Sequence, residues 1–184
     1  IIARNSSIGL NLLEDVNRLE ALENKKIEVS LKPVLLLQAV QGAIALSDSM
    51  IRKKKIDFHI SIPEKYLIFA DEDFLVSTII GNLVSNAVKF SFPESTIRIN
   101  AEKEDGHISL RIRDDGIGIP ESLLADIFDS NRPTSRRGTM NEPGTGFGMP
   151  LVKRFIESMS GEIKIESQVD RGTEVILRFR SADR

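Results

Sequence analysis

Cysteine and tryptophan are absent from this chain of 184 residues, which has only two histidines and one tyrosine. Without cysteine, a disulfide framework, thiol catalysis and cysteine-ligated zinc are excluded. His59 and His107 stand in alternating, strand-like stretches, and two histidines are too few ligands for a metal centre. We therefore interpret both as surface or edge-strand residues.

The chain also lacks a strong charge of either sign and a long apolar run. Its 25 basic and 27 acidic residues leave a net charge of -2, without the basic footprint of a nucleic-acid binder. No apolar run approaches the roughly 18–20 residues that span a bilayer, and no signal peptide is visible. The hydrophobic content of 41% suffices for one good core. Because the first residue is Ile1, we expect the chain to be a piece of a longer protein.

Residues 1–24 are predicted to form an amphipathic helix. Apolar side chains recur there at spacings of three and four residues, with charged residues between them, at Ile8, Leu12, Val16, Leu19 and Leu22. Such a stripe packs either on the chain's own core or against another helix in a bundle or coiled-coil dimer.

The rest of the chain interleaves helices with pairs of strands. Helices are predicted over about 34–54, 71–90, 120–128 and 147–159, and strands over 56–62, 66–70, 95–103, 107–113, 161–168 and 173–180. Asp71 is a good N-cap for the helix that follows it. The segment 129–146 is rich in glycine, proline and polar residues and is expected to be a long loop. This alternation predicts an α+β sandwich, with one sheet covered by a layer of helices.

The helix over 71–90 carries a polar stripe beside its apolar face. Asn82, Asn86 and Lys89 follow one another at steps of four and three residues, so they share one side of the helix. Amide oxygens are hard ligands that suit magnesium, and a lysine suits phosphate. Taken alone, the stripe is also compatible with the ordinary polar flank of an amphipathic helix.

Two glycine-containing segments follow. Asp114 ends a strand that runs into Gly116 and Gly118, where a ligand could approach the backbone and the carboxylate could accept a hydrogen bond from an exocyclic amine such as that of adenine. In isolation, Asp-Gly is a common turn. Residues 144–148 open a helix after a loop that contains three arginines, and backbone amides at a helix start form a natural anion site. Their spacing matches neither the dinucleotide fingerprint nor the P-loop, and the arginines (Arg132, Arg136 and Arg137) are also compatible with solvated loop charges.

These segments, in this order, resemble the nucleotide-binding boxes of the histidine-kinase branch of the family that includes gyrase-type and heat-shock-chaperone ATPases. The N box corresponds to residues 82–90, the first glycine box to 114–118 and the second to 144–148. Ile127-Phe128 resembles the start of the F box, and Gly172-Thr173 resembles the threonine-bearing element near the adenine. The likeness covers about residues 30–180.

The resemblance implies a two-layer α/β sandwich, in which helices cover a mixed, mostly antiparallel sheet, preceded by an N-terminal helix from a dimerisation domain. Residues 1–28 would be the C-terminal part of the dimerisation and phosphoacceptor helix, because residues 1–24 resemble the second helix of such a domain. Residues 29–184 would be the catalytic ATP-binding domain.

The resemblance also implies roles for individual residues. Asn86 would hold Mg²⁺ with Asn82 beside it, and Lys89 would meet the phosphates of ATP. Asp114 would read the adenine amino group. Residues 129–146 would be a mobile lid over the phosphates. Further ATP contacts are expected at Gly116, Gly118, Ile119, Arg136, Arg137, Gly144, Thr145, Gly146, Phe147, Gly148, Met149 and Thr173.

Three positions depart from relatives. Asn131 stands where many relatives carry a second aromatic residue, and Asp115 stands where the glycine box usually has asparagine. The hydrolytic members of the family place a glutamate, as general base for water, where this chain has Asn82. Because an amide is a poor proton acceptor, Asn82 favours phosphoryl transfer to a side chain over hydrolysis.

The resemblance therefore implies an ATP-dependent protein histidine kinase of a two-component signalling system. Its partners would be a phosphoacceptor histidine helix, in the same chain or in the partner of a homodimer, and a response regulator receiver domain, but no nucleic acid. No residue of this chain is a convincing acceptor. We expect a cytoplasmic domain, compatible with a membrane anchor elsewhere in the full-length protein. The alternatives are a degenerate nucleotide-sensing or docking module, suggested by Asn131, and a serine kinase of the same fold.

Overall fold

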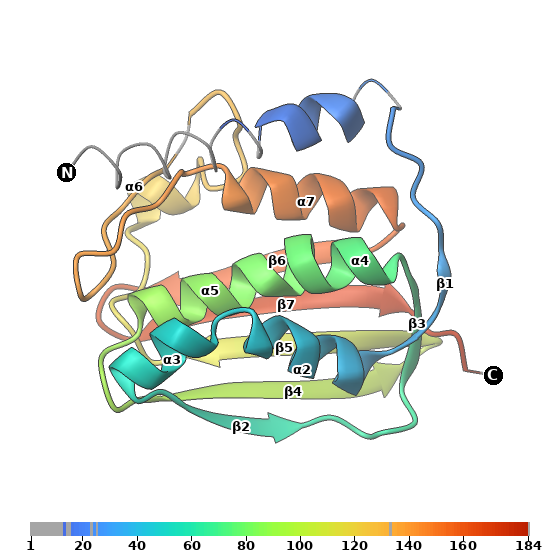
Figure 1. The fold of residues 1–184 in the computed structure, drawn as a ribbon, viewed down its shortest axis with the longest axis horizontal. Coiled ribbons are helices and arrows are strands. Elements are labelled where there is room, and N and C mark those ends of the chain that lie inside the picture. Colours follow the sequence, from blue (N-terminus) through green and yellow to red (C-terminus); the bar gives the residue numbers. More distant parts are fainter. Residues whose placement is uncertain (1–12, 14–15, 23, 25, 133, 184) are drawn as a thin grey trace.

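The computed structural model describes residues 13, 16–22, 24, 26–132 and 134–183. Figure 1 shows a layer of helices over one face of a β-sheet. The elements are, in order, β1 (Lys32–Leu35), α2 (Leu36–Ala45), α3 (Asp48–Lys54), β2 (Asp57–Ser61), β3 (Leu67–Ala70), α4 (Glu72–Phe74), a π-helical segment (Leu75–Ile80), α5 (Gly81–Phe90), β4 (Thr96–Glu104), β5 (His107–Asp114), α6 (Glu121–Leu124), α7 (Gly148–Ser158), β6 (Glu162–Gln168) and β7 (Gly172–Arg180).

The main sheet has five strands in the order β2-β4-β5-β7-β6. β2 lies parallel to β4, and the other neighbouring pairs are antiparallel. The predicted sandwich with a mixed, mostly antiparallel sheet is thereby confirmed. β3 does not pair with β2, which precedes it, but forms a separate two-stranded antiparallel sheet with β1.

The prediction of one continuous helix over 34–54 is wrong. Val34 and Leu35 belong to β1, where they pair with Ile68 and Leu67 of β3. The helix over the remaining residues is broken between α2 and α3, and the backbone carbonyl of Ser47 accepts hydrogen bonds from the first turn of α3. Pairing with a distant strand outweighs the helical periodicity of this stretch.

The helix predicted over 71–90 is present, with an irregularity that the sequence did not indicate. Asp71 caps it, since its carboxylate accepts a hydrogen bond from Phe74 N at 3.3 Å. The next turns, residues 75–80, are π-helical before α5 begins. Gly81 follows at a crowded point, because a Cβ there would lie 2.8 Å from the carbonyl oxygen of Val76. The π-helical segment is thus continuous with α5, which carries the predicted polar stripe.

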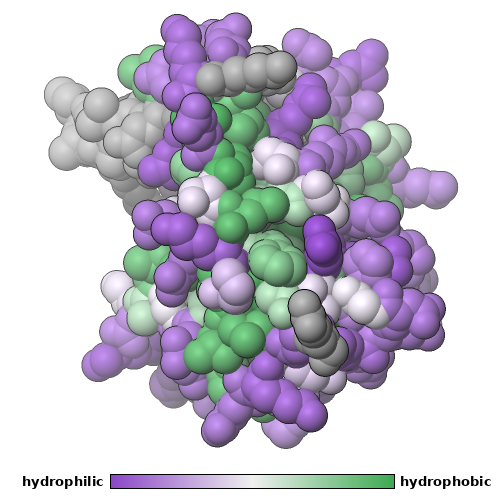
Figure 2. Space-filling model, turned by 90° about the vertical axis from the view of Figure 1, so that its right-hand side faces the viewer, coloured by the Kyte–Doolittle hydropathy of each residue, from purple (hydrophilic) through white to green (hydrophobic). Residues whose placement is uncertain are grey.

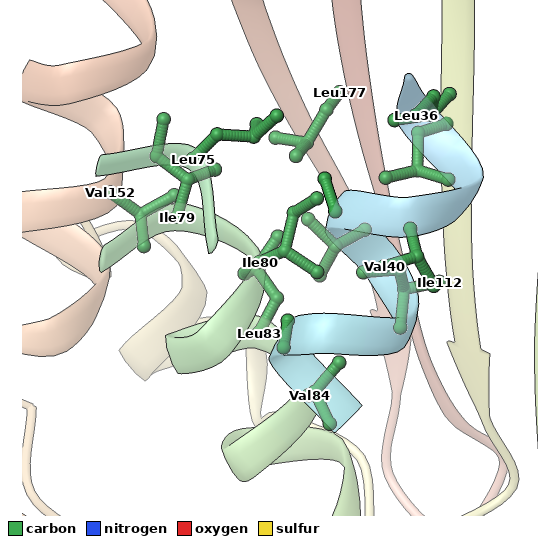
Figure 3. Packing of buried hydrophobic residues seen from close by; sticks show 14 of the residues in the cluster. Leu36, Val40, Leu75, Ile79, Ile80, Leu83, Val84, Ile112, Val152 and Leu177 are labelled. Atoms are coloured by element: carbon green, nitrogen blue, oxygen red, sulfur yellow. The ribbon is translucent and has the colours of Figure 1, made fainter. Parts of the chain in front are cut away.

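The core lies between the helices and the sheet. Figure 3 shows it from close by: α2, the π-helical segment and α5 interleave with residues from α7 and from strands β5 and β7, among them Leu36, Val40, Leu75, Ile80, Leu83, Val152, Ile112 and Leu177. Each of these side chains is buried. This packing fixes α5 across the ends of β5 and β7, where the candidate site lies.

The N-terminal helix is described from Val16 to Leu22 and at Leu13. Leu19 is buried within the hydrophobic core, and Leu22 packs partly buried against it. This part of the predicted stripe therefore packs on the chain's own core. Ile8 and Leu12 lie outside the described residues, and a role of this helix in dimerisation stays a prediction.

Large exposed hydrophobic side chains are few among the described residues. Figure 2 views the molecule from the end where β1, β3 and the C-terminus lie, and shows a narrow run of hydrophobic residues bordered by hydrophilic ones. Single exposed residues of this kind, such as Leu31 and Leu46, are ordinary for a globular protein. Among the residues that the structure describes, no helix is both long and apolar enough to cross a membrane.

Candidate functional site

A cavity of about 380 Å³ opens between α5, the ends of β5 and β7, and the loop that leads into α7. The predicted site residues that line it are Asn82, Asn86, Lys89, Asp114, Ile119, Arg136, Gly144, Thr145, Gly146, Gly148, Met149 and Thr173. Segments that are far apart in the sequence thus meet around one space, which is also lined by apolar side chains, among them Leu83, Ile112, Ile127, Ile165 and Val175.

Four predicted residues do not line the cavity. Gly116 and Gly118 pack against backbone instead: a Cβ on Gly116 would meet the Phe90 carbonyl, and a Cβ on Gly118 would meet the Gln168 carbonyl. Gly118 also has a φ of +63°, which favours glycine. Arg137 donates to Asn141 Oδ1 at 2.7 Å, while the side chain of Phe147 packs on the core.

The amide stripe of α5 faces the cavity. Asn82 Nδ2 donates to the carbonyl of Thr78 at 2.6 Å, and a Cβ on Gly148 would lie 2.8 Å from Asn82 Oδ1. Asn86 Nδ2 makes a weak contact of 3.5 Å with the sulfur of Met149. Among the described residues, Asn86 Oδ1 has no hydrogen-bond partner, so this hard oxygen is available to a cation.

Two cations lie beside the same aromatic ring. The Lys89 ammonium is 4.7 Å and the Arg136 guanidinium 5.1 Å from the centroid of the Phe90 ring. Burial lowers the pKa of Lys89; the Glu142 carboxylate opposes this shift, and Arg136 and Lys54 add to it. A partly dehydrated pair of positive charges is a suitable environment for phosphate groups.

Asp114 brings a carboxylate to the other wall of the cavity. It lies at the end of β5 and is 6% exposed. Burial raises its pKa to about 6, although hydrogen bonds from the backbone of Gly116, at 2.9 Å, and of Thr173 stabilise its charged form. At neutral pH the group is therefore mainly a carboxylate, which can only accept hydrogen bonds.

Ser167 was missed in the sequence. Its hydroxyl donates to Gly172 O at 2.9 Å, accepts from Ile119 N at 2.8 Å and lies 2.9 Å from Thr173 Oγ1. It thus joins Ile119, which follows the first glycine box, to the start of β7. The signal that could have found it is the register of this hairpin, in which Ser167 and Thr173 are opposite each other.

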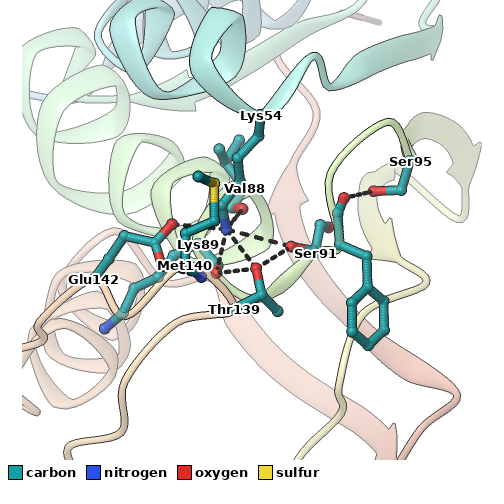
Figure 4. Close-up of polar contacts among 9 residues, drawn as sticks. Lys54, Val88, Lys89, Ser91, Ser95, Thr139, Met140 and Glu142 are labelled. Carbon is teal, nitrogen blue, oxygen red and sulfur yellow. Dashed lines mark hydrogen bonds and ion pairs between the residues drawn. The ribbon is translucent and has the colours of Figure 1, made fainter.

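Lys54 is a second residue that no pattern in the sequence singles out, because it stands in a run of four basic residues, 52–55. Its ammonium is buried under the loop that follows α6, as Figure 4 shows. It pairs with the carboxylate of Glu142 at 2.8 Å. Four other oxygens lie within hydrogen-bond distance and share its three N–H donors with Glu142: Val88 O at 2.9 Å, Lys89 O at 2.6 Å, Ser91 O at 3.3 Å and Thr139 Oγ1 at 2.7 Å.

This buried lysine fixes the centre of the expected lid. The anchored turn, residues 138–142, is closed by a hydrogen bond from Gly138 N to Glu142 O and is held on the end of α5 by one from Thr139 N to Lys89 O at 3.1 Å. Within the segment 129–146, residues 138–142 are thus held on the end of α5. The role of the segment as a mobile lid stays a prediction.

A further cation reaches the cavity from the N-terminal helix. Arg18 lines the cavity, and its guanidinium lies 3.5 Å from Thr78 Oγ1. No pattern in the sequence indicates this contact, because the position of that helix on the domain depends on tertiary packing. Arg132, by contrast, pairs with Asp126 at 3.3 Å.

Residues 70–183 match the model of the histidine kinase-, DNA gyrase B-, and HSP90-like ATPases. The chain belongs to this family. It is 29% identical to hybrid signal transduction histidine kinase A of Dictyostelium discoideum over 94% of this chain and 9% of that protein. It is 28% identical to the circadian input-output histidine kinase CikA of Synechococcus elongatus over 89% of this chain and 22% of that protein.

Solved structures show the same relationship. Full-length ShkA in complex with AMPPNP matches 98% of this chain and 37% of its own, with a TM-score of 0.79 and 26% identity. The catalytic domain of histidine kinase ThkA matches 84% of this chain and 96% of its own, with a TM-score of 0.70 and 25% identity. The predicted resemblance is confirmed: this is an ATP-binding catalytic domain of the histidine kinase type. It spans less than a quarter of the two curated relatives.

Proposed function

We propose that this domain binds Mg-ATP in the cavity beside α5 and donates the γ-phosphoryl group to a histidine on a phosphoacceptor helix. The observation that carries the proposal is the meeting of three kinds of group around one cavity: an amide oxygen on Asn86, the cations Lys89 and Arg136, and the buried carboxylate of Asp114.

The groups present fit adenine. Asp114 offers a hydrogen-bond acceptor of the kind that an exocyclic amine requires, and apolar side chains beside it, such as Ile112 and Val175, suit the faces of a base. The ThkA catalytic domain and the AMPPNP complex of ShkA share this fold, which supports a nucleotide in the same region.

The groups present also fit phosphate and a divalent cation. The backbone of residues 144–148 leads into the first turn of α7, where N–H groups have no helical partner and favour anions. Among the described residues, no cluster of three histidine, cysteine or acidic side chains exists that could hold a metal. Mg²⁺ would therefore take Asn86 as a protein ligand, with phosphate and water oxygens completing its coordination.

In this proposal the chain positions reactants and neutralises charge, and Mg-ATP supplies the electrophilic phosphoryl group. Asn82, whose amide nitrogen already donates to Thr78 O, cannot accept a proton from water. This supports transfer to an acceptor side chain over hydrolysis. The acceptor would lie on a dimerisation helix, of which residues 1–28 form the C-terminal part, and a receiver domain would accept the phosphoryl group next.

The proposal is tested by mixing this chain with a fragment that carries a functional acceptor helix, in the presence of Mg²⁺ and γ-labelled ATP. We expect an acid-labile, base-stable phosphohistidine on the acceptor, and its loss with the Asn86→Ala variant. The matched control is Asn100→Ala, on the sheet strand β4, which should transfer normally. An acid-stable product would indicate a serine kinase instead, and nucleotide binding without any transfer would indicate a sensing module.

A further inference from the structure

The hydroxyl of Ser167 lies behind the wall of the cavity, in a position that the family resemblance left without a role. It is half-buried on β6 and directly opposite Thr173, which lines the cavity. Three hydrogen bonds, of 2.8 to 2.9 Å, satisfy it completely.

The directions of these bonds follow from counting protons. Ser167 has one hydroxyl proton, and the Gly172 carbonyl can only accept, so the proton is directed to Gly172 O. Ile119 N can only donate and occupies one lone pair of Ser167. The remaining bond, between the two hydroxyls, must therefore be donated by Thr173.

This arrangement determines what Thr173 presents to the cavity. Because its proton is directed to Ser167, Thr173 Oγ1 offers only lone pairs to a ligand. In the strand register, Thr173 is paired with Asp114, whose carboxylate is also an acceptor. Two acceptors thus stand side by side on this wall of the cavity.

We propose that Ser167 is a positioning residue that determines base specificity, by holding the Thr173 hydroxyl as an acceptor. The inference rests on the proposed nucleotide site. A base with an amino group at this wall, such as adenine, satisfies both acceptors. A base with a carbonyl there, such as hypoxanthine or guanine, places its oxygen against the two acceptors of the protein. No hydrogen bond can then form, and burying such unpaired groups costs binding free energy.

The test compares the binding of ATP and ITP, whose bases carry an amino group and a carbonyl at the same position, by calorimetry with Mg²⁺. The wild-type chain should strongly prefer ATP. In Ser167→Ala the Thr173 proton is released and can be donated to a carbonyl. The dissociation constant for ITP divided by that for ATP should therefore fall roughly tenfold, partly through tighter ITP binding. Ser167→Thr keeps the hydroxyl and should retain the ratio.

A purely structural role of Ser167 would weaken both nucleotides equally, and an unchanged ratio in Ser167→Ala would overturn the inference. If Ser167→Ala does not fold, as judged by circular dichroism, Thr173→Val carries the test. That variant removes one acceptor and should also narrow the ratio, and an unchanged ratio there would contradict the inference. A wild-type chain that binds neither nucleotide would instead overturn the proposed site, and this inference with it.

Discussion

Lys54 and Glu142 form an ion pair of 2.8 Å in which the lysine side chain is fully buried and the glutamate side chain is 16% exposed. The pair joins the end of α3 to the loop that precedes α7. The same ammonium donates hydrogen bonds to the backbone carbonyls of Val88 and Lys89 at the end of α5, and the lysine is buried. Its charge also complements the C-terminal end of the helix dipole of α5.

Glu142→Gln should destabilise the domain, because it leaves a buried ammonium with only neutral acceptors. We expect the free energy of unfolding, measured with urea, to fall by on the order of 2–4 kcal/mol. The matched control is Glu94→Gln. Its partner Lys55 lies at a similar distance, 2.7 Å, but both side chains of that pair are mainly exposed, so the loss should be under about 0.5 kcal/mol.

The same variant should also loosen the anchored turn. Trypsin should cleave the chain faster after Arg136 and Arg137, next to this turn, in Glu142→Gln than in Glu94→Gln, under conditions where both remain folded. Equal cleavage rates and equal stabilities in the two variants would show that the buried pair does not hold the lid.

Asp114→Asn should stabilise the domain at neutral pH and at the same time weaken its binding of ATP. The pKa of Asp114 is raised to about 6, so the folded state holds this proton more tightly than the unfolded state does. The stabilisation that comes from protonated Asp114 is fully present below its unfolded pKa of about 4, and it is lost as the pH rises through its folded pKa of about 6. At pH 7.5 the neutral asparagine should therefore raise the free energy of unfolding by on the order of 2 kcal/mol.

At pH 4 the stabilities of Asp114→Asn and the wild type should converge, since Asp114 is then protonated in the folded state. ATP binding should be weakened at neutral pH, because the amide offers a donor in place of one acceptor oxygen. Urea unfolding at the two pH values checks the first statement and calorimetry the second. A variant less stable than the wild type at pH 7.5 would contradict the assignment of burial as the main cause of the shift.

Gly144→Ala should impair nucleotide binding without unfolding the domain. The added Cβ would meet the Lys89 ammonium, which is the end of a flexible side chain and can move away. We expect a change in the free energy of unfolding of less than about 1 kcal/mol and a dissociation constant for ATP raised roughly tenfold.

Gly106→Ala is the control for Gly144→Ala. Gly106 has a φ of +72° and open space around it, so alanine there costs about 1 kcal/mol of stability and should leave ATP binding unchanged. Normal ATP binding by Gly144→Ala would show that the position of Lys89 does not matter for the phosphates.

Removal of magnesium should reproduce the effect of Asn86→Ala. The wild-type chain should bind ATP more weakly in EDTA than in Mg²⁺, whereas Asn86→Ala, lacking the amide oxygen, should show little difference between the two conditions. Calorimetry in both buffers measures this, with Asn100→Ala as the control. A full magnesium effect in Asn86→Ala would remove Asn86 from the metal site.

Much of the fold followed from local signals in the sequence. The Asp71 cap marked the start of a helix. The predicted strands over 95–103 and 107–113 are joined by Asp105 and Gly106, an Asp-Gly pair that favours tight hairpins, and both residues adopt a positive φ. The polar stripe of α5 was also readable, since helical periodicity alone places Asn82, Asn86 and Lys89 on one side. These features depend on residues within a few positions of each other.

Other features were decided only by tertiary structure. Val34 and Leu35 became a strand because a partner strand was available, and Arg136 rather than Arg137 reached the cavity because of the path of the loop. Lys54 gained its role from oxygen atoms of distant segments, and Ser167 gained its role partly from the backbone N–H of Ile119, which is also distant in the sequence. A sequence shows which groups can form hydrogen bonds, but burial and the packing of remote elements determine which partners they meet.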